Sequence, residues 1–328
     1  MQKFRNIVWC VSIPALLLGG GAMAQSTVDS FPSRPMTWIA SYAAGGPNDQ
    51  ETRLYANKMT SLLGQQVIMD FKGGAGGTIG YGAVAKAAPD GYTLLIATGS
   101  YTIIPWLYKD LPFDSFKDFA PVTQISKRAS VLAVTPSFPA KTFAEYITYA
   151  RNNPDKINVG TAGAGGISHL AVALVHSMSK TRVTYVHYKG TGPVMPDLMA
   201  GRVDITSVAL LAVLPLLKAG KLRALALTDD KRSRLVPEVP TVAEQGLPEY
   251  SVPNWLGFLA PAATPAAIVN KLGENFALVA RAPEVLAPLE AGGSILVGNT
   301  PAQFRQFIAT DSAVWKKVIQ ETGIKLEE

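Results

Sequence analysis

Cysteine and histidine are scarce in this sequence, which has one cysteine and three histidines among 328 residues. Cys10 lies next to an apolar run at 11–18, which Lys3 and Arg5 precede and small residues follow as far as Ala24. This order of positive charge, short apolar core and small residues is typical of a cleavable signal peptide. We therefore expect export from the cytoplasm, with cleavage near Ala24.

Cleavage would remove residues 1–24 and with them the only cysteine. The remaining chain then forms no disulfide and has neither a thiol nucleophile nor a thiolate metal ligand. The apolar run at 11–18 is far shorter than the roughly 20 residues that span a bilayer, and no later stretch of the sequence is typical of a membrane span. We expect a soluble mature protein, with an uncleaved N-terminal anchor as the alternative.

Long runs of one charge are also missing, although the formal net charge is +6. The basic residues are scattered and form no stripe interleaved with aromatic residues, which argues against nucleic acid as a partner. No Walker pattern occurs. The pattern G-x-G-x-x-A fits 80–85, but this segment falls inside a predicted helix and no acidic residue follows at the expected spacing, which argues against a dinucleotide site.

The three histidines give no clear metal or catalytic signal. His169 and His176 lie seven residues apart, about two helical turns, with no evident third ligand. We therefore predict no metal and no cofactor. Ser168 precedes His169 directly, but the sequence has no G-x-S-x-G elbow, so a hydrolase is only a distant alternative. His169 is either a hydrogen-bond donor to an anion at a helix start or a structural cap.

Short apolar runs alternate with helical stretches along the chain. The runs 36–42, 66–71 and 92–97 each end in a turn of small residues, and a second series begins near 131. This rhythm predicts an α/β fold built on parallel sheet.

The Pro-rich stretch 236–253 is typical of a crossing between domains, and a second crossing is expected near 120–130. Two crossings predict a discontinuous first lobe, residues 25–126 plus 254–328, and a second lobe, residues 127–253. Two such lobes can close on a ligand between them.

Three glycine-rich turns, at 43–46, 73–77 and 161–166, follow predicted strands. In open α/β sheets, ligands bind beyond the carboxyl ends of the strands. Small residues let backbone N–H groups approach a ligand, and the next helix presents its positive end. Two facing turns could therefore hold a carboxylate without a buried arginine. The alternative is that the glycines only permit tight turns.

Aromatic residues lie close to these turns and to the Pro-rich crossing. Tyr42 precedes the first turn, Tyr101 follows the third strand and Trp255 follows the crossing. They predict a partly aromatic cleft, with burial in the core as the alternative.

Eight stretches of the sequence, taken together, resemble the substrate-binding proteins of tripartite tricarboxylate transporters, the Bug receptors of Gram-negative bacteria. In chain order they are AAGGPND (43–49), GGAGGTIG (73–80), APDGYTLLIATGS (88–100), LYKDLPFDSFKDFAPVT (107–123), GTAGAGGISHL (160–170), YKGTGPVMPDLMAGRVD (188–204), AGKLRALALTDDKRS (219–233) and VPTVAEQGLP (239–248).

The resemblance implies a two-lobed periplasmic binding protein of type II that closes on a small carboxylate. Its partner would be a membrane permease, or a sensor kinase if the protein is a sensory receptor, and nothing suggests more than a monomer. The two turns that would hold the carboxylate supply Tyr42, Ala44, Gly45, Asn48, Asp49, Thr161, Gly163, Gly165, Ser168 and His169. Candidates for specificity further along the cleft are Ser100, Tyr101, Thr206, Ser207 and Trp255.

The chain departs from the usual residues of that family at Tyr42, Ala43, Gly73 and 205–207. These positions are expected near the cleft, so the ligand need not be one of the family's common ones. An aliphatic dicarboxylate and an aromatic carboxylate are both compatible with the sequence.

Overall fold

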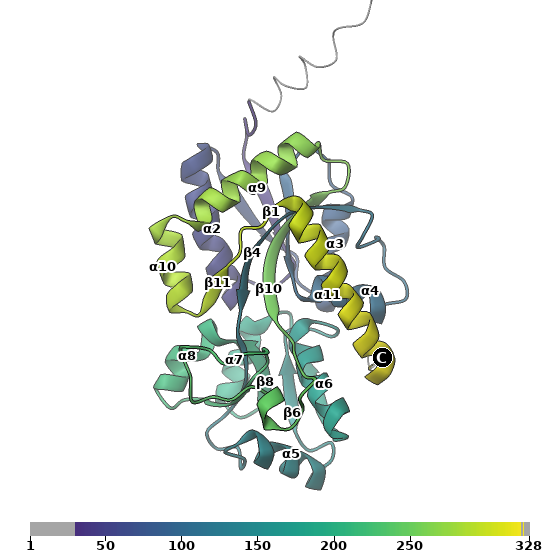
Figure 1. The fold of residues 1–328 in the computed structure, drawn as a ribbon, viewed down its shortest axis with the longest axis vertical. Helices are drawn as coiled ribbons and strands as arrows, with labels where there is room; N and C mark the ends of the chain where they lie inside the picture. The colour runs from purple at the N-terminus through teal and green to yellow at the C-terminus, as the bar shows by residue number, and fades with distance from the viewer. Residues whose placement is uncertain (1–29, 323, 325–328) are drawn as a thin grey trace, which may run out of the picture.

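The computed structural model describes residues 30–322 and 324, so the predicted signal peptide and Cys10 lie outside the described residues. The chain forms two lobes, each built on its own sheet and stacked along the long axis of the molecule (Figure 1). Within the part of the chain that the structure describes, no helix combines the length and the apolar character needed to cross a membrane.

Lobe 1 contains a six-stranded sheet with the order β11-β4-β10-β3-β1-β2. Its strands are β1 (Met36–Ala40), β2 (Val67–Phe71), β3 (Thr93–Thr98), β4 (Phe119–Arg128), β10 (Asn254–Pro261) and β11 (Ser294–Leu296). Its helices are α2 (Pro47–Leu63), the 3₁₀ turn η1 (Ala75–Gly77), α3 (Thr78–Ala85), α4 (Ser100–Leu107), α9 (Ala266–Ala280), α10 (Pro283–Ala291) and α11 (Pro301–Thr322).

Lobe 2 contains a five-stranded sheet with the order β7-β6-β8-β5-β9. Its strands are β5 (Ser130–Val134), β6 (Asn158–Thr161), β7 (Thr184–His187), β8 (Ile205–Ala209) and β9 (Arg223–Leu227). Its helices are α5 (Phe143–Asn152), α6 (Ile167–Ser179), α7 (Thr191–Met199), α8 (Leu210–Lys218) and the 3₁₀ turn η2 (Ala243–Gln245).

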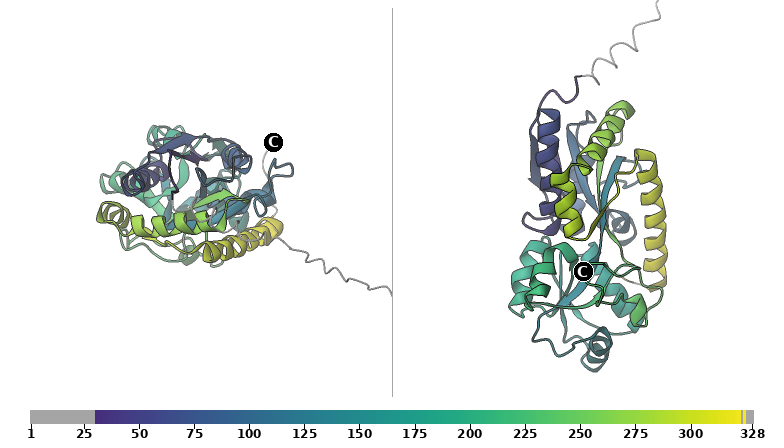
Figure 2. Two further views of the ribbon diagram at one scale, coloured as in Figure 1. Left: turned by 90° about the horizontal axis from the view of Figure 1, so that it is seen from above. Right: turned by 60° about the vertical axis from the view of Figure 1, so that its left-hand side comes forward.

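Helices cover both faces of each sheet because consecutive strand residues point to opposite faces. In β1, Trp38 packs with α2, α9 and α10, whereas its neighbour Ile39 packs with α3, α4 and α11. In β5, Leu132 faces α5 and α6, and Val131 faces α7 and α8. Both lobes are therefore three-layered, and the right-hand view of Figure 2 shows the strands of lobe 1 between helices.

The prediction of a two-lobed α/β fold is confirmed, but the expectation of a parallel sheet is only partly right. β1 pairs in parallel with β2 and β3, and β6 with β7 and β8. β10 runs antiparallel to both β3 and β4, and β5 runs antiparallel to β8 and β9. The cause is the crossing, because β4 carries the chain out of lobe 1 and the adjacent β10 brings it back.

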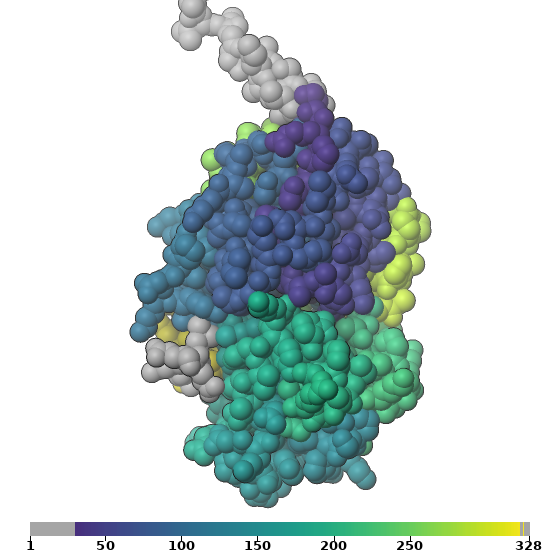
Figure 3. Space-filling model, turned by 180° about the vertical axis from the view of Figure 1, so that it is seen from behind, coloured from purple at the N-terminus to yellow at the C-terminus, as the bar shows by residue number. Residues whose placement is uncertain are grey.

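The chain passes from one sheet to the other at Ala129, between β4 and β5, and returns through the segment 228–253. At the return point Asn254 lies opposite Arg128, so the two crossings are neighbours. Seen from behind, the two lobes touch along a seam across the middle of the molecule (Figure 3).

Candidate functional site

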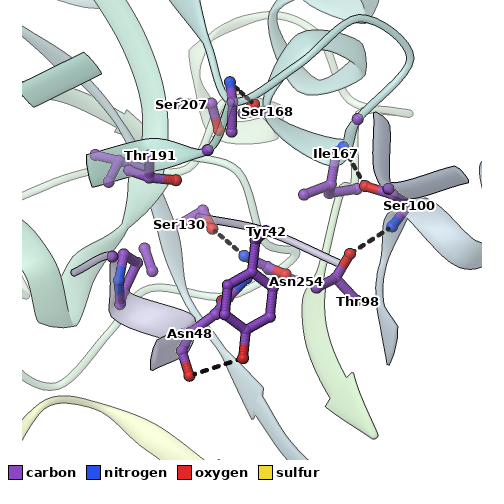
Figure 4. Close-up of a pocket in the computed structure, with 18 of the residues that line it drawn as sticks. Tyr42, Asn48, Thr98, Ser100, Ser130, Ile167, Ser168, Thr191, Ser207 and Asn254 are labelled. Atoms are coloured by element: carbon purple, nitrogen blue, oxygen red, sulfur yellow. Dashed lines mark hydrogen bonds between the residues drawn. The ribbon is translucent and has the colours of Figure 1, made fainter. Parts of the chain in front are cut away.

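A cavity lies between the lobes at the carboxyl ends of the strands. With the solvent at its opening it has a volume of about 810 Å³. Figure 4 shows polar side chains from both lobes around it. They include Tyr42, Asn48, Thr98, Ser100, Ser130, Ser168, Thr191, Ser207, Thr228 and Asn254.

The starts of six helices meet at this cavity. The residues that cap or begin them line it, namely Gly46 for α2, Gly77 for α3, Ser100 for α4, Gly166 for α6, Gly190 for α7 and Ala209 for α8. Each helix start carries backbone N–H groups without helical partners and the positive end of the helix dipole. Six such ends around one space make it favourable for an anion.

Side-chain charge contributes little to this preference. Among the described residues that line the cavity, the one cationic side chain is Lys189, which is exposed. The carboxylate of Asp49 lies at the edge of the first turn, where it accepts a hydrogen bond from Gly45 N at 2.9 Å and pairs with Arg53 Nε at 2.7 Å. The positive character therefore comes mainly from backbone N–H groups.

Turns from the two lobes contact each other directly around the cavity. Ile167 N of lobe 2 donates to Ser100 Oγ of lobe 1 at 2.9 Å, and Tyr108 OH of lobe 1 donates to Ala164 O at 2.9 Å. A Cβ atom added at Gly76 would lie 2.6 Å from Ala164 O. The structure is therefore a closed form, in which the turns at 73–77 and 161–166 are too close for any residue larger than glycine at Gly76.

The first turn is held by the side chains that follow it. Tyr42 is buried, and its hydroxyl lies 3.0 Å from Thr52 Oγ1 and 3.3 Å from Asn48 O. Burial raises the pKa of the Tyr42 phenol, so it is neutral at pH 7. These contacts fix the backbone from Tyr42 to Asn48 before any ligand arrives.

The turn at 161–166 in lobe 2 is held by Ser168 and His169. Ser168 Oγ accepts from Ala162 N at 2.8 Å, and His169 Nδ1 accepts from Gly165 N at 3.1 Å. Burial, together with nearby His187, lowers the pKa of His169 to about 4, so its ring is neutral and can accept this hydrogen bond. His169 therefore makes the capping contact of its two predicted roles.

The arrangement does not resemble a nucleophile and its base. Ser168 and His169 each accept from a backbone N–H of the turn, and no hydrogen bond between them is found among the described residues. Throughout the residues that the structure describes, no group of three or more His, Cys, Asp and Glu side chains is placed to hold a metal.

Five of the predicted ligand-binding residues line the cavity: Tyr42, Asn48, Ser100, Ser168 and Ser207. Six others lie in the two turns or their flanks without lining it: Ala44, Gly45, Asp49, Thr161, Gly163 and Gly165. Thr161 Oγ1 lies 2.6 Å from His187 Nδ1. These six shape the turns that bring the backbone to the cavity.

Four further predicted residues do not line the cavity, namely Tyr101, Thr206, Trp255 and His169. Tyr101 OH donates to Ser115 O, and Trp255 Nε1 donates to Asp311 Oδ2 at 3.2 Å, both inside the lobe 1 core. Thr206 Oγ1 donates to Gly160 O at 2.7 Å. Strand alternation explains two of these cases, because the neighbours Ser207 and Asn254 face the cavity instead.

Among the polar residues that line the cavity, sequence reasoning missed Thr98, Ser130, Thr191, Thr228 and Asn254. Ser130 and Asn254 flank the two crossings, and Thr191 is the first residue of α7. The signals that identify them are a polar residue at the end of a strand, at a domain crossing, or directly after a glycine that caps a helix.

Two lobes joined by paired crossings, with an anion-favouring cavity between them, define a solute-binding protein. The sequence model of the tripartite tricarboxylate transporter family receptor matches residues 52–324. The chain belongs to this family, to which the Bug proteins also belong, as its sequence predicted.

Relatives of similar length are found in several bacteria. A protein of Pseudomonas sp. strain P51, from the tcbD-tcbE intergenic region, is 35% identical over 313 residues, 93% of either chain. Protein BugT of Bordetella pertussis is 32% identical over 309 residues, 94% of this chain and 95% of its own.

Solved structures share the whole fold. The periplasmic binding protein BugD is 30% identical with a TM-score of 0.87, over 90% of this chain and 100% of its own. Rpa4515 of R. palustris, solved with adipate, is 34% identical with a TM-score of 0.85, over 90% and 99% of the two chains. MatC of Rhodopseudomonas palustris, solved with malate, is 32% identical with a TM-score of 0.85, over 88% and 100%.

Proposed function

We propose that this protein captures a small carboxylate between its lobes in the periplasm and delivers it to a membrane permease of the tripartite tricarboxylate type. The observation that carries the proposal is the meeting of six helix starts at one cavity. Each start favours an anion by roughly 0.3–1 kcal/mol, and each hydrogen bond to a charged group adds about 1.5–3 kcal/mol.

The ligand we propose is an aliphatic dicarboxylate. Malate and adipate occupy two relatives, and hydroxyl and amide groups dominate the polar lining here. An aromatic carboxylate has less support than the sequence suggested, because Tyr101 and Trp255 are buried in the core and Tyr42 alone of the three lines the cavity.

Closure is proposed to move lobe 1, predicted as residues 25–126 plus 254–328 and extended by β4 to Arg128, against the rest of the predicted lobe 2. The adjacent crossings at Ala129 and at Asn254 would serve as the hinge. The turns that meet in the closed form would separate when the lobes open, and this gives the ligand a path into the cavity.

A thermal-shift screen tests the ligand class. The mature protein is melted with aliphatic mono- and dicarboxylates of about three to eight carbons, hydroxy acids and benzoates. A ligand at 100 times its Kd is expected to add about 2.7 kcal/mol to the free energy of unfolding. If no carboxylate raises the melting temperature, the proposal is wrong.

Delivery and export need their own measurements. Deleting the gene is expected to abolish uptake of the best ligand by intact cells, and uptake by the deletion strain at the wild-type rate would contradict permease delivery. Intact mass spectrometry of periplasmic protein is expected to show a chain that begins near Gln25.

A further inference from the structure

Asn48 lies in the first turn of α2, directly after Pro47, and has an amide whose orientation the structure fixes. Its Oδ1 accepts a hydrogen bond from Arg128 Nη2. A guanidinium group has only donors, so the amide atom that faces it must be the oxygen and not the nitrogen. The two donors of Asn48 Nδ2 are therefore turned away from Arg128.

Arg128 in turn is held by a buried carboxylate. Its Nη1 donates to Glu51 Oε2 at 2.9 Å, and the two side chains are 1% and 0% exposed. Ser126 Oγ donates to the other oxygen of Glu51, and Ser294 Oγ lies 3.5 Å from Oε2. Glu51, Ser126 and Ser294 are all buried, so these hydrogen bonds hold the guanidinium of Arg128 in one position beside Asn48.

The free end of the amide belongs to a residue that lines the cavity. Asn48 is half-buried at the cavity wall, and no hydrogen bond from its Nδ2 is found within the described residues. Arg128 itself is neutralised by Glu51. The charge of Arg128 is therefore balanced inside the protein, and the group offered to a ligand is a neutral, directed amide donor.

We propose that Asn48 Nδ2 is a specificity-determining donor to the ligand's carboxylate, and that Arg128 and Glu51 are its positioning residues. This inference rests on the proposed function and adds to it the side chain that selects an acceptor group. A ligand group that only donates hydrogen bonds, such as an ammonium, is rejected at this position because it would face a second set of donors.

Titration calorimetry with the carboxylate that binds the wild-type protein most tightly tests the donor. Asn48→Ala is expected to weaken binding about 10- to 100-fold, the value of a hydrogen bond to a charged group. Asn48→Asp keeps an acceptor for Arg128 but replaces the donor that faces the ligand with a second acceptor. It is therefore expected to weaken binding at least as much as Asn48→Ala does, and to leave the melting temperature of the unliganded protein unchanged. Asn57→Ala, at an exposed position on the same helix, is the matched control and is expected to bind as the wild type does.

A double-mutant cycle tests the positioning pair. Glu51→Leu with Arg128→Met replaces both charges by apolar groups, an exchange that buried ion pairs often tolerate. This variant is expected to bind more weakly than the wild type, and adding Asn48→Ala is expected to cost less than threefold more, because the amide has already lost its fixed orientation.

The outcomes separate the two proposals. If the wild-type protein binds no carboxylate, the proposed function fails and this inference fails with it. If the wild type binds but Asn48→Ala binds equally well, only the donor role is overturned. If Asn48→Ala costs the same factor in both backgrounds, Asn48 acts without Arg128 and the positioning role is wrong.

Discussion

Two buried histidines bear on how this protein responds to acid. His169 is 3% and His176 is 4% exposed. The pKa of each is lowered to about 4, by burial in both cases and, for His169, also by the nearby His187. His176 also lies 2.7 Å from Tyr146 OH and 2.6 Å from Thr181 Oγ1, contacts that a neutral ring can make.

The sign of the pH effect follows from these lowered values. Between pH 6.5 and pH 4 the unfolded chain protonates these histidines and the folded protein does not, so stability is full above pH 6.5 and falls as the pH falls. Each histidine is expected to cost about 2 kcal/mol of unfolding free energy between pH 7 and pH 5.

Urea unfolding of wild type and His169→Gln at the two pH values checks this prediction. The variant is expected to be less stable at pH 7, because Gly165 N loses its ring acceptor, but to lose about 2 kcal/mol less on acidification. An equal loss in both proteins would show that His169 is already charged in the folded state.

At the residue scale, the sequence predicted which strand ends lie at the site but not which side chains face it. Ser207 and its neighbour Thr206 were both predicted at the cleft, but only Ser207 lines the cavity, whereas Thr206 donates to Gly160 O within lobe 2. Trp255 was predicted at the cleft, where Asn254 lies instead. One step along a strand reverses the face, and the face depends on which helices pack on either side of the sheet. No local pattern contains that information.

At the scale of elements, the glycine turns set how closely the lobes approach. Gly76 has φ +66° and lies in η1 against Ala164 of lobe 2, whereas Gly64 has φ +65° at the end of α2 with no atom near its missing Cβ. The two positions demand the same backbone conformation but differ in what a side chain would meet. They therefore separate backbone strain from interference with closure.

Gly76→Ala is expected to weaken carboxylate binding about 10- to 100-fold, because its methyl group overpacks the seam between the lobes. Gly64→Ala is expected to lower the unliganded unfolding free energy by about 1 kcal/mol, the cost of a left-handed alanine, and to leave the affinity unchanged. Calorimetry and urea unfolding of both variants measure the two effects. Equal affinities in the two variants would mean that the lobes do not close at Gly76.

The order of elements was more predictable than their directions. Each strand followed by a glycine turn was found where the sequence placed it, because turn and helix-start signals are local. The antiparallel course of β10 was not predicted, since it arises from pairing with β4 more than 120 residues earlier. The expectation that the turns 43–46 and 161–166 meet came from the family resemblance and not from any spacing. Both turns line the cavity, but the close approaches pair Gly76 with Ala164 and Gly46 with Gly192.

At the scale of the whole molecule, α11 ties the two lobes together beside the cavity. Phe304 and Ile308 are buried in the lobe 1 core, and Trp315 is buried two turns later in the core of lobe 2. Ile103 from α4 joins that same lobe 2 cluster. Figure 1 shows α11 running along lobe 1 and past the seam. Apolar contacts therefore favour the closed form even where no ligand bridges the lobes.

Trp315→Ala is expected to shift the unliganded protein toward an open form, because the tail of α11 then loses its anchor on lobe 2. Small-angle X-ray scattering is expected to give a larger radius of gyration than for the wild type, and a saturating carboxylate is expected to restore the compact value. Val314→Ala, at a neighbouring position that is 53% exposed, serves as the control and is expected to scatter like the wild type. Circular dichroism confirms that both variants are folded. If Trp315→Ala is folded and as compact as the wild type without ligand, α11 does not hold the lobes together, and closure depends on the ligand and on the turns around the cavity.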